Sequence, residues 1–268
     1  MRIPFTKAHG AGNDFLLTWA EDVPKDDLPE LARKVCDRHA GVGADGWLLV
    51  KKTSASTGCD ASIRLFNADG SEPEMSGNGT RCAAAFLLDA GALQGTQMRI
   101  GTGAGVKDLR LIEHNDLHFL FEMNMGNPTY TDEDLRLRLP LAGGAREVAE
   151  LNVGNPQCVV FVDDFDFDWR RMGAEIEAHP HFPNRTNVSF VRPVDAHAID
   201  VLFFERGVGE TMSSGTGSTG AAAAAILRGV AESPLQVRTP AGPIDLRWDG
   251  GIYLTGPAVI IAGGEFYY

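Results

Sequence analysis

The amino-acid sequence predicts an α+β fold built from two related halves. Short apolar stretches bounded by turn residues alternate with a few helix-forming segments, and one pattern of motifs occurs twice. The length of 268 residues agrees with two halves, since a domain typically takes roughly 150 residues. Many short strands with few helices favour an α+β arrangement over a regular alternation of βαβ units.

Five short apolar stretches have the composition of β-strands. Each is rich in branched or aromatic side chains, and Gly, Asn or Asp residues bound it. The predicted strands are residues 47–50, 63–66, 117–123, 158–162 and 198–204.

Three segments are predicted to be helical. Residues 80–90 and 218–227 are rich in alanine and contain no proline, which favours helix. Both are so apolar that we expect them to be buried. Gly91 and Gly229 follow these segments and are expected to end the helices. Residues 28–38 form a third, amphipathic candidate.

The internal repeat joins an asparagine loop to a glycine-rich helix start. Ser76-Gly-Asn-Gly-Thr-Arg opens the first alanine-rich segment, and Ser214-Gly-Thr-Gly-Ser-Thr opens the second. Asn13 lies 63 residues before Ser76, and Asn155 lies 59 residues before Ser214. The repeat therefore predicts two halves of about 130 residues. If a pseudo-twofold axis relates them, the two helix starts could face each other across a cleft.

Two facing helix starts would suit a reaction at one stereocentre. Glycine-rich turns at helix N-termini expose backbone N–H groups and the positive end of the helix dipole, so each can hold a carboxylate. Ser76 and Ser214 enter the two turns and would flank the central carbon of the ligand. One group on each face is the arrangement of a cofactor-independent racemase or epimerase, with one general base and one general acid.

Charge and composition exclude several classes of protein. The formal net charge of −12 argues against nucleic-acid and anionic-membrane partners, because both need a basic face. No apolar run approaches the roughly 18 residues of a transmembrane helix, and the N-terminus lacks the apolar region of a signal peptide. The four cysteines lie far apart, which indicates free thiols in a reducing cytoplasm.

Other enzyme classes are disfavoured. Residues 41–46 and 215–220 match the G-x-G-x-x-G pattern of dinucleotide sites, but we expect neither in a parallel βαβ unit. A serine hydrolase would need a His and an acid near Ser214, and no G-x-S-x-G motif is present at either serine. His9 is expected in a loop, and the acidic run 163–168 in a solvated turn that lacks the pattern of a calcium loop. We expect neither a metal nor a cofactor.

Seven blocks, in order along nearly the whole chain, resemble the diaminopimelate epimerase family. They are 7–15, 38–46, 66–72, 76–82, 154–160, Asn187 and 205–217. The resemblance implies two pseudo-symmetric halves, each a mixed or antiparallel sheet wrapped around a central buried helix. The halves would be residues 1–122 with a returning strand at 258–268, and residues 123–257.

The resemblance also implies an activity. It is the interconversion of LL- and meso-diaminopimelate by two-base proton transfer at the α-carbon, in lysine and peptidoglycan precursor biosynthesis. Such an enzyme is cytoplasmic, uses no cofactor and takes a small amino-acid substrate as its partner. The resemblance is also compatible with a homodimer.

Site residues follow from the same resemblance. The catalytic positions are Ser76 and Ser214, and Asn13 also matches a substrate-binding position. The distal end of the substrate would contact Asn67, Asn155, Asn187 and Arg206. Backbone donors for the reacting carboxylate would be Gly77, Asn78, Gly215 and Thr216, and Glu205 would contact the amino group. These types suit their roles, because a guanidinium forks onto a carboxylate and an amide both donates and accepts.

The sequence departs from the family at its catalytic positions. The family uses two cysteines, and Ser76 and Ser214 stand in their places. A thiol has a pKa of about 8.5, which a helix N-terminus lowers further, whereas a hydroxyl needs a partner base. Gln157 stands where the family has a His. Gly46 stands where a Gln is common, and this difference removes an amide from the substrate side.

Three explanations of the serines stay open. They could be an engineered pair that traps bound substrate. They could mark a natural variant with altered chemistry, such as a slow epimerase, a dehydratase or an isomerase of another amino acid. They could also mark a binding protein that has kept the pocket and lost the reaction. Gln157 and Gly46 favour natural divergence, since a trapping pair would not require them.

Overall fold

The computed structural model describes residues 1–24, 27–53 and 58–268. The chain divides into two compact units. Unit 1 comprises Met1–Met123 and Gly256–Tyr268, and unit 2 comprises Asn124–Thr255. Within the described residues, no helix has both the length and the apolar character needed to span a bilayer.

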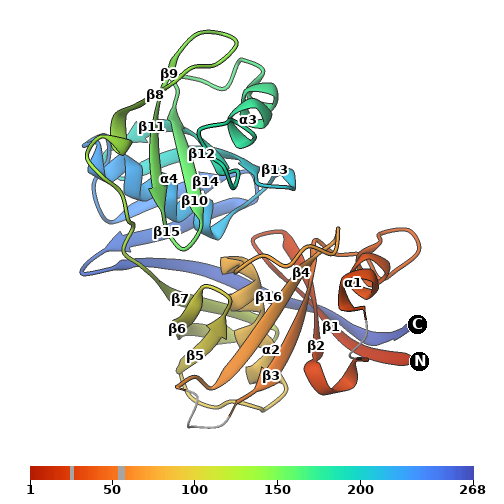
Figure 1. Cartoon of the computed structure of the whole chain (residues 1–268). Helices are drawn as coiled ribbons and strands as arrows, with labels where there is room; N and C mark the ends of the chain where they lie inside the picture. Colours follow the sequence, from red (N-terminus) through yellow and green to blue (C-terminus); the bar gives the residue numbers. More distant parts are fainter. Residues whose placement is uncertain (25–26, 54–57) are drawn as a thin grey trace. The chain divides into compact units, whose positions relative to one another are not determined.

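Unit 1 is a closed sheet of eight strands (Figure 1). Strands β1 to β7 follow one another in the sheet, and β16 closes it by pairing with both β7 and β1. The strands are β1 (Arg2–Gly10), β2 (Asn13–Trp19), β3 (Gly46–Lys52), β4 (Ala61–Asn67), β5 (Gln97–Thr102), β6 (Gly105–Asn115), β7 (His118–Gly126) and β16 (Ile252–Tyr267). Unit 1 holds β16 from Gly256 onward.

Helix α2 (Gly77–Asp89) is the central helix of unit 1. It packs against β1 to β5, and its first eleven residues, Gly77 to Leu87, are buried. Alanine side chains at positions 83–85 are fully buried, and their small size lets the strands approach the helix closely. Helix α1 (Leu28–Cys36) packs on the other side of the sheet, where Leu31 joins Trp47 and Phe66 in a separate core. A short 3-10 helix, η1 (Ala20–Asp22), follows β2.

Unit 2 has the strand order β15-β14-β12-β11-β10-β9-β8, with β13 paired to β12. The strands are β8 (Leu137–Leu139), β9 (Arg146–Asn152), β10 (Pro156–Phe161), β11 (Asn187–Asp195), β12 (Ala198–Glu205), β13 (Gly209–Thr211), β14 (Leu235–Thr239) and β15 (Gly242–Trp248). Residues 252–255 of β16 pair with β15.

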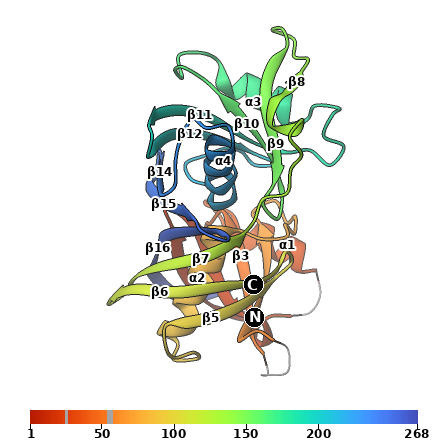
Figure 2. The ribbon, with the colours of Figure 1, turned by 90° about the vertical axis from the view of Figure 1, so that its left-hand side faces the viewer.

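Helix α4 (Gly215–Leu227) occupies the centre of unit 2 (Figure 2). It packs against β9, β10, β11, β12, β14 and β15, and residues Gly215 to Ala225 are buried. Helix α3 (Trp169–Glu177) lies on the other side of the sheet, where Trp169 and Ile176 pack with Phe190. A 3-10 helix, η3 (Asp134–Arg136), precedes β8.

Parallel strand pairs occur wherever a helix connects neighbours. Helices α1 and α2 join the parallel pairs β2–β3 and β4–β5. Helices α3 and α4 join the parallel pairs β10–β11 and β12–β14. The expectation that neither glycine motif lies in a parallel βαβ unit is therefore wrong, because residues 41–46 connect α1 to β3 and residues 215–220 open α4. The units do not alternate regularly, since the antiparallel pairs β3–β4 and β11–β12 lie between them. The sheet-dominated mixed architecture with few helices is confirmed.

The two central helices end in the same backbone motif. In α2, the N–H of Gly91 donates to Leu88 and the N–H of Ala92 to Leu87. In α4, Gly229 and Val230 donate to Ile226 and Ala225 in the same way. Gly91 and Gly229 have φ values of +64° and +71°, the left-handed conformation that this Schellman motif favours in glycine. Both predicted helix ends are confirmed.

Several local predictions need correction. Helix α1 ends at Cys36, two residues early, because the Asp37 carboxylate accepts from the backbone of His39 and Ala40 and forms a turn. The run 163–168 is irregular, but its last residue, Asp168, caps the unpredicted helix α3 by accepting from Arg171.

Two further corrections concern strands, whereas the predicted strands themselves are found. His9 lies in β1 and not in a loop, and its Nδ1 accepts from the N–H of Gly12. The glycine motif 215–220 follows the three-residue strand β13 and opens α4, which lies between the parallel strands β12 and β14. The five predicted strands are confirmed as β3, β4, β7, β10 and β12.

Candidate active site

The start of α2 is built around Ser76. Ser76 has extended backbone angles, and its Oγ accepts a hydrogen bond of 3.1 Å from the N–H of Gly79. Its carbonyl oxygen accepts from both the N–H and the hydroxyl of Thr80. An N-cap of this kind satisfies one of the four N–H groups that lack a partner within the helix. The backbone N–H groups of Gly77 and Asn78 belong to the same first turn.

The start of α4 has the same construction around Ser214. The Ser214 Oγ accepts from the N–H of Gly217 at 3.0 Å, and its carbonyl accepts from Ser218. Ser214 is 5% exposed. Gly217 is required here, because a Cβ at this position would lie 2.8 Å from the ring of Phe203. Each unit therefore presents one serine-capped, glycine-rich helix start.

In the described part of the chain, neither serine hydroxyl is hydrogen-bonded to a side chain that could act as a base. Both hydroxyl oxygens accept from a backbone N–H, which leaves each hydroxyl with its proton to donate. The buried cysteines near these helices do not supply the missing thiolate. Burial raises the pKa of Cys82 to about 12 and raises the pKa of Cys158 as well, so both are neutral thiols at pH 7.

Asn13 and Asn78 are linked beside the α2 start. The Asn78 Nδ2 donates to the Asn13 Oδ1 at 3.3 Å, and the Asn13 Nδ2 donates to Asp45 at 2.7 Å. Asn13 begins β2 at the β1–β2 hairpin, and this hairpin lies so close to α2 that a Cβ at Gly10 would be 3.1 Å from the Asn78 Cβ. The fold thus brings these two predicted residues together.

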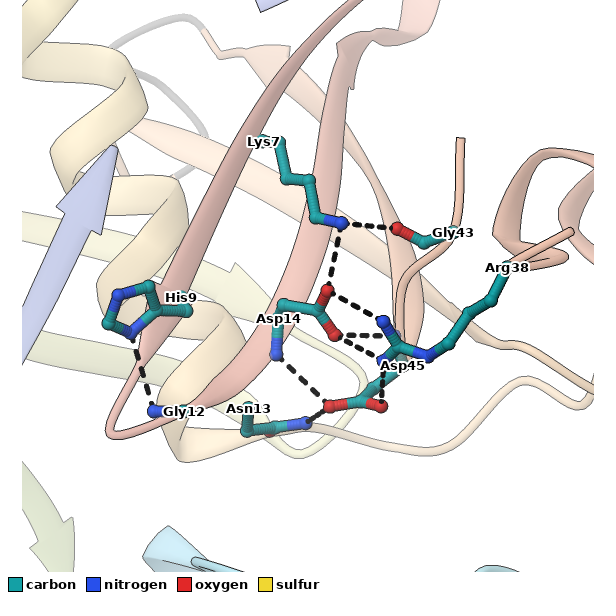
Figure 3. A network of polar contacts seen from close by, with 8 residues as sticks. All are labelled: Lys7, His9, Gly12, Asn13, Asp14, Arg38, Gly43 and Asp45. Atoms are coloured by element: carbon teal, nitrogen blue, oxygen red, sulfur yellow. Dashed lines mark hydrogen bonds and ion pairs between the residues drawn. The ribbon is translucent and has the colours of Figure 1, made fainter. Parts of the chain in front are cut away.

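Two acidic and two basic side chains brace this hairpin (Figure 3). Asp14 forms ion pairs with Lys7 at 3.0 Å and with Arg38 at 2.7 Å, and Arg38 also contacts Asp45 at 2.7 Å. Burial raises the pKa of Asp14, but hydrogen bonds from Arg38 and Lys7 outweigh it and hold that pKa below its usual value. The hydrogen bond to Asp14 raises the pKa of Arg38. Sequence reasoning did not assign roles to these residues, although blocks 7–15 and 38–46 contain all four.

Asn67 ends β4 opposite Gly46 in the register of β3 and β4. Its Nδ2 donates to the hydroxyl of Ser71 at 3.0 Å. A Cβ at Gly46 would lie 3.0 Å from the carbonyl oxygen of Phe66 and 3.2 Å from the Phe15 ring. These neighbours pack tightly around position 46, where the resemblance leads one to expect a glutamine.

A second amide chain lies at the α4 start. The Gln157 Nε2 donates to the Asn155 Oδ1 at 2.7 Å, and the Asn155 Nδ2 donates to the Thr216 hydroxyl at 3.2 Å. Gly220 makes space for this arrangement, because a Cβ there would be 2.9 Å from the Gln157 Cγ. The Gln157 Oε1 is buried without a hydrogen-bond partner. The structure thus brings together Asn155 and Thr216, two residues that were predicted to bind the substrate.

Asn187 connects three segments of unit 2. Its Nδ2 donates to the carbonyl of Pro156 at 2.9 Å, and its Oδ1 accepts from the N–H of Arg206 at 3.1 Å. The Arg206 guanidinium donates to the carbonyl of Asn184 at 3.3 Å. Glu205 accepts from the Thr211 hydroxyl at 2.8 Å. Five residues were assigned to distal and amino-group contacts. Of these, Asn187 is hydrogen-bonded to Arg206, and Glu205 directly precedes Arg206. Asn67 belongs to unit 1, and Asn155 is hydrogen-bonded to Gln157 and Thr216.

Glu177 is a positioning residue that sequence reasoning missed. It is buried at the end of α3, where its carboxylate accepts from the N–H of Gly207 at 3.1 Å and pairs with Arg185. It therefore holds the turn that carries Arg206. Glu177 could have been noticed only by predicting helix α3 from the sequence. Asp168, which caps α3, was instead assigned to a solvated turn.

The family model for diaminopimelate epimerase matches residues 5–131 and 150–261. The chain belongs to the diaminopimelate epimerase family. It is therefore an isomerase by family. A diaminopimelate epimerase of Pelotomaculum thermopropionicum is 39% identical over 279 residues, with 98% of this chain and 99% of the relative covered. One of an Azoarcus species is 40% identical over 278 residues, with 99% of both covered.

Solved structures of lower identity share the fold. A hydroxyproline epimerase of Agrobacterium vitis matches with a TM-score of 0.77 at 17% identity, covering 98% of this chain and 92% of that one. A phenazine biosynthesis protein of the PhzF family from Bacillus anthracis matches with a TM-score of 0.71 at 16% identity, covering 100% of both chains. At this identity the likeness concerns the fold alone.

Proposed function

We propose that the chain is a cofactor-independent epimerase that interconverts LL- and meso-diaminopimelate, with Ser76 and Ser214 in the acid and base positions. The observation that carries the proposal is the serine-capped helix start that each unit provides, in a chain of this family. One serine would remove the α-proton and the other would return a proton to the opposite face. The reaction would serve lysine and peptidoglycan precursor biosynthesis.

The reacting carboxylate is proposed to bind the helix-start N–H groups. Free N–H groups and the helix dipole favour an anion there, and neither helix has an acidic residue in its first turn to compete. The donors are those of Gly77, Asn78, Gly215 and Thr216. As negative charge develops on the substrate in the transition state, these fixed dipoles stabilise it.

The other substrate contacts are proposed from residues that the fold already holds. Arg206 suits the distal carboxylate because its guanidinium presents a fork of donors. Asn67, Asn155 and Asn187 suit the distal polar groups. Asn155 and Asn187 each use one side-chain donor and one acceptor, and Asn67 uses one donor, so each amide keeps at least one donor and one acceptor for the substrate. Asn13 lies against the α2 start through Asn78, and Glu205 is an acceptor for an ammonium group.

The hydroxyl groups of Ser76 and Ser214 limit the rate expected for the proposed epimerisation. A serine hydroxyl loses its proton far less readily than a thiol, and no base lies beside either hydroxyl in the described part of the chain. The proposed enzyme is therefore slow on diaminopimelate.

A second candidate is an isomerase or dehydratase of another amino acid, or a protein that binds without turnover. The observation that favours it is Gly46, where a Cβ would lie only 3.0–3.2 Å from Phe66, Leu65 and Phe15, so that this position is tightly packed without a side chain. Gln157 supports it too, because its amide replaces an ionisable imidazole next to Asn155.

Deuterium exchange separates these functions. The chain is incubated with LL-diaminopimelate in heavy water, and α-deuterium and stereochemistry are followed by NMR and chiral chromatography. Uptake with inversion supports the epimerase. Uptake without inversion indicates one working base. Saturable binding by calorimetry without uptake supports the binding protein, and neither binding nor uptake contradicts diaminopimelate as the substrate.

A further inference from the structure

The α2 start contains a buried cation that the proposed reaction does not yet use. Arg81 is the fifth residue of α2 and is fully buried. Its Nε donates to the carbonyl of Pro257 at 3.2 Å and its Nη2 donates to the Asn78 Oδ1. Its Nη1 is buried with no hydrogen-bond partner. Gly256 accommodates this side chain, since a Cβ there would lie 3.0 Å from the guanidinium carbon.

Arg81 remains charged in this position. Burial lowers its pKa to about 10, which still leaves a cation at neutral pH. Among the ion pairs of the described residues, none joins a carboxylate to Arg81. Nearby, Lys7 and Arg38 offset Asp14 and Asp45 in charge, so that cluster does not neutralise it.

Arg81 also fixes the direction of the amide chain. Its Nη2 donates to Asn78, Asn78 donates to Asn13, and Asn13 donates to Asp45. A guanidinium only donates and a carboxylate only accepts, so turning either amide over would place donor against donor and acceptor against acceptor. The two ends thus leave each amide one orientation, next to the N–H groups of Gly77 and Asn78.

The α4 start lacks an equivalent charge. Five residues after Ser214 stands Thr219, a neutral residue whose hydroxyl donates to the carbonyl of Gly215 at 2.8 Å. Arg81 stands five residues after Ser76, which is about 8 Å along a helix axis. At such a separation a full charge in the protein interior acts on the helix start with little screening.

We propose that Arg81 is a positioning residue that orients the Asn78 amide and makes the α2 start the stronger anion site of the two, so that the group at position 76 gives up its proton more readily than the group at position 214. The proposal rests on the proposed function only for its catalytic meaning, namely that position 76 carries the base in the resting state. The charge difference itself is a property of the folded chain.

Thiols introduced at the two positions report this difference without substrate. Ser76→Cys and Ser214→Cys are made separately, each with Arg81 and with Arg81→Met or Arg81→Lys. The rate of alkylation by iodoacetamide is followed against pH, and mass spectrometry of the peptides separates the new thiol from the four native cysteines. The midpoint of each profile is the pKa of that thiol.

The expected pKa is about 1.5 units lower at position 76 than at position 214, from Coulomb's law for about 8 Å and an effective dielectric constant of about 20. Arg81→Met should raise the pKa at position 76 by about that amount and leave position 214 unchanged, whereas Arg81→Lys, which keeps the charge, should preserve most of the lowering. Glu74 lies two residues before position 76, and His9 precedes Gly10, which lies against Asn78. Glu205 and Glu210 lie near position 214 in the chain, and Arg170 pairs with Glu210. They are the same in all variants.

Two results would overturn the proposal. One is a pKa at position 76 equal to or above that at position 214. The other is an Arg81→Met variant that moves both thiols alike. If Arg81→Met does not fold, the thiol pKa values of Ser76→Cys and Ser214→Cys, both with Arg81 retained, still decide whether position 76 is the more acidic. Absence of turnover on diaminopimelate would contradict the proposed function and leave this charge difference standing.

Discussion

A serine at a helix start both caps the helix and carries a dissociable proton. In this chain the Oγ atoms of Ser76 and Ser214 are fixed by N–H groups at 3.1 and 3.0 Å. That geometry aims each hydroxyl at the helix start but does not ionise it, because a backbone N–H is not a base. Residue chemistry, rather than placement, therefore limits the proposed reaction.

The double variant Ser76→Cys/Ser214→Cys tests that limit. We expect α-deuterium exchange on LL-diaminopimelate to rise by orders of magnitude, because each working general base is typically worth about 10²–10⁴-fold. The measurement is the initial rate of exchange by NMR. Ser76→Ala and Ser214→Ala are the matched controls and should show no gain. A double variant that gains nothing would show that the site is not built for this substrate.

Asp14 makes a second prediction at the residue scale. Asp14→Asn should destabilise the chain by about 1–3 kcal/mol at pH 7, because Lys7 is only 17% exposed and loses its counter-charge. Since the folded state lowers the pKa of Asp14, its stabilising effect is complete above the unfolded pKa and is lost as pH falls through the folded pKa.

Urea unfolding of the unsubstituted chain and of Asp14→Asn, measured at several pH values, checks this prediction. The difference between them should be largest above about pH 5 and narrow steadily toward pH 3. Glu72→Gln is the control, since its pair with Arg64 is exposed and should be worth under about 1 kcal/mol. A difference that is unchanged between pH 7 and pH 3 would contradict the assignment to the Asp14 carboxylate.

At the element scale, composition and burial explain what the sequence could predict. The alanine-rich segments predicted α2 and α4 with their glycine ends, because an all-apolar helix must be buried and only glycine readily adopts the final left-handed turn. Helix α3 escaped prediction because two of its four buried residues, Gly173 and Glu177, do not have apolar side chains, and its start follows an acidic run. Strands such as β6, mostly exposed, carry no apolar alternation to detect.

The candidate site shows the same division. Ser76 and Ser214 were found because the motif recurs and helix physics gives it a meaning. Arg81 and Glu177 were not, since their roles depend on Pro257 and Gly207, which lie 176 and 30 residues away. Only the folded chain brings such partners together. The pseudo-twofold relation of the halves stays a prediction.

Gly173 tests the packing of α3. Alanine favours helix over glycine by about 1 kcal/mol, but a Cβ at this position would lie 2.8 Å from Cβ and Cγ of Phe204 in β12. Overpacking costs about 1–3 kcal/mol, so we expect Gly173→Ala to lower the free energy of unfolding. Ala174→Gly, at the next and exposed position, should cost about 1 kcal/mol from propensity alone. A stabilised Gly173→Ala variant would show that α3 does not pack on β12.

At the scale of the whole molecule, the last strand holds unit 1 closed. Strand β16 pairs with β1 from Arg2↔Tyr267 to His9↔Val259, and Phe266 packs on the core that contains Ile3 and Leu16. The ring around α2 therefore depends on residues at opposite ends of the sequence. Unit 2 has no share in these pairs, since its strands β8 to β15 pair among themselves and with residues 252–255.

Removal of residues 263–268 should loosen one unit and spare the other. It deletes five of the eight registered β1–β16 pairs and the Phe266 side chain. We expect faster amide hydrogen exchange in β1, β2 and the first turn of α2, because these opened elements lose buried hydrogen bonds. Amides of α4 and β10–β12 should exchange as before. Removing Tyr268 alone, which lies beyond the registered pairs, is the matched control. Equal loss of protection in both units would show that they unfold as one, and that closure of unit 1 is not the separate event its strand pairing implies.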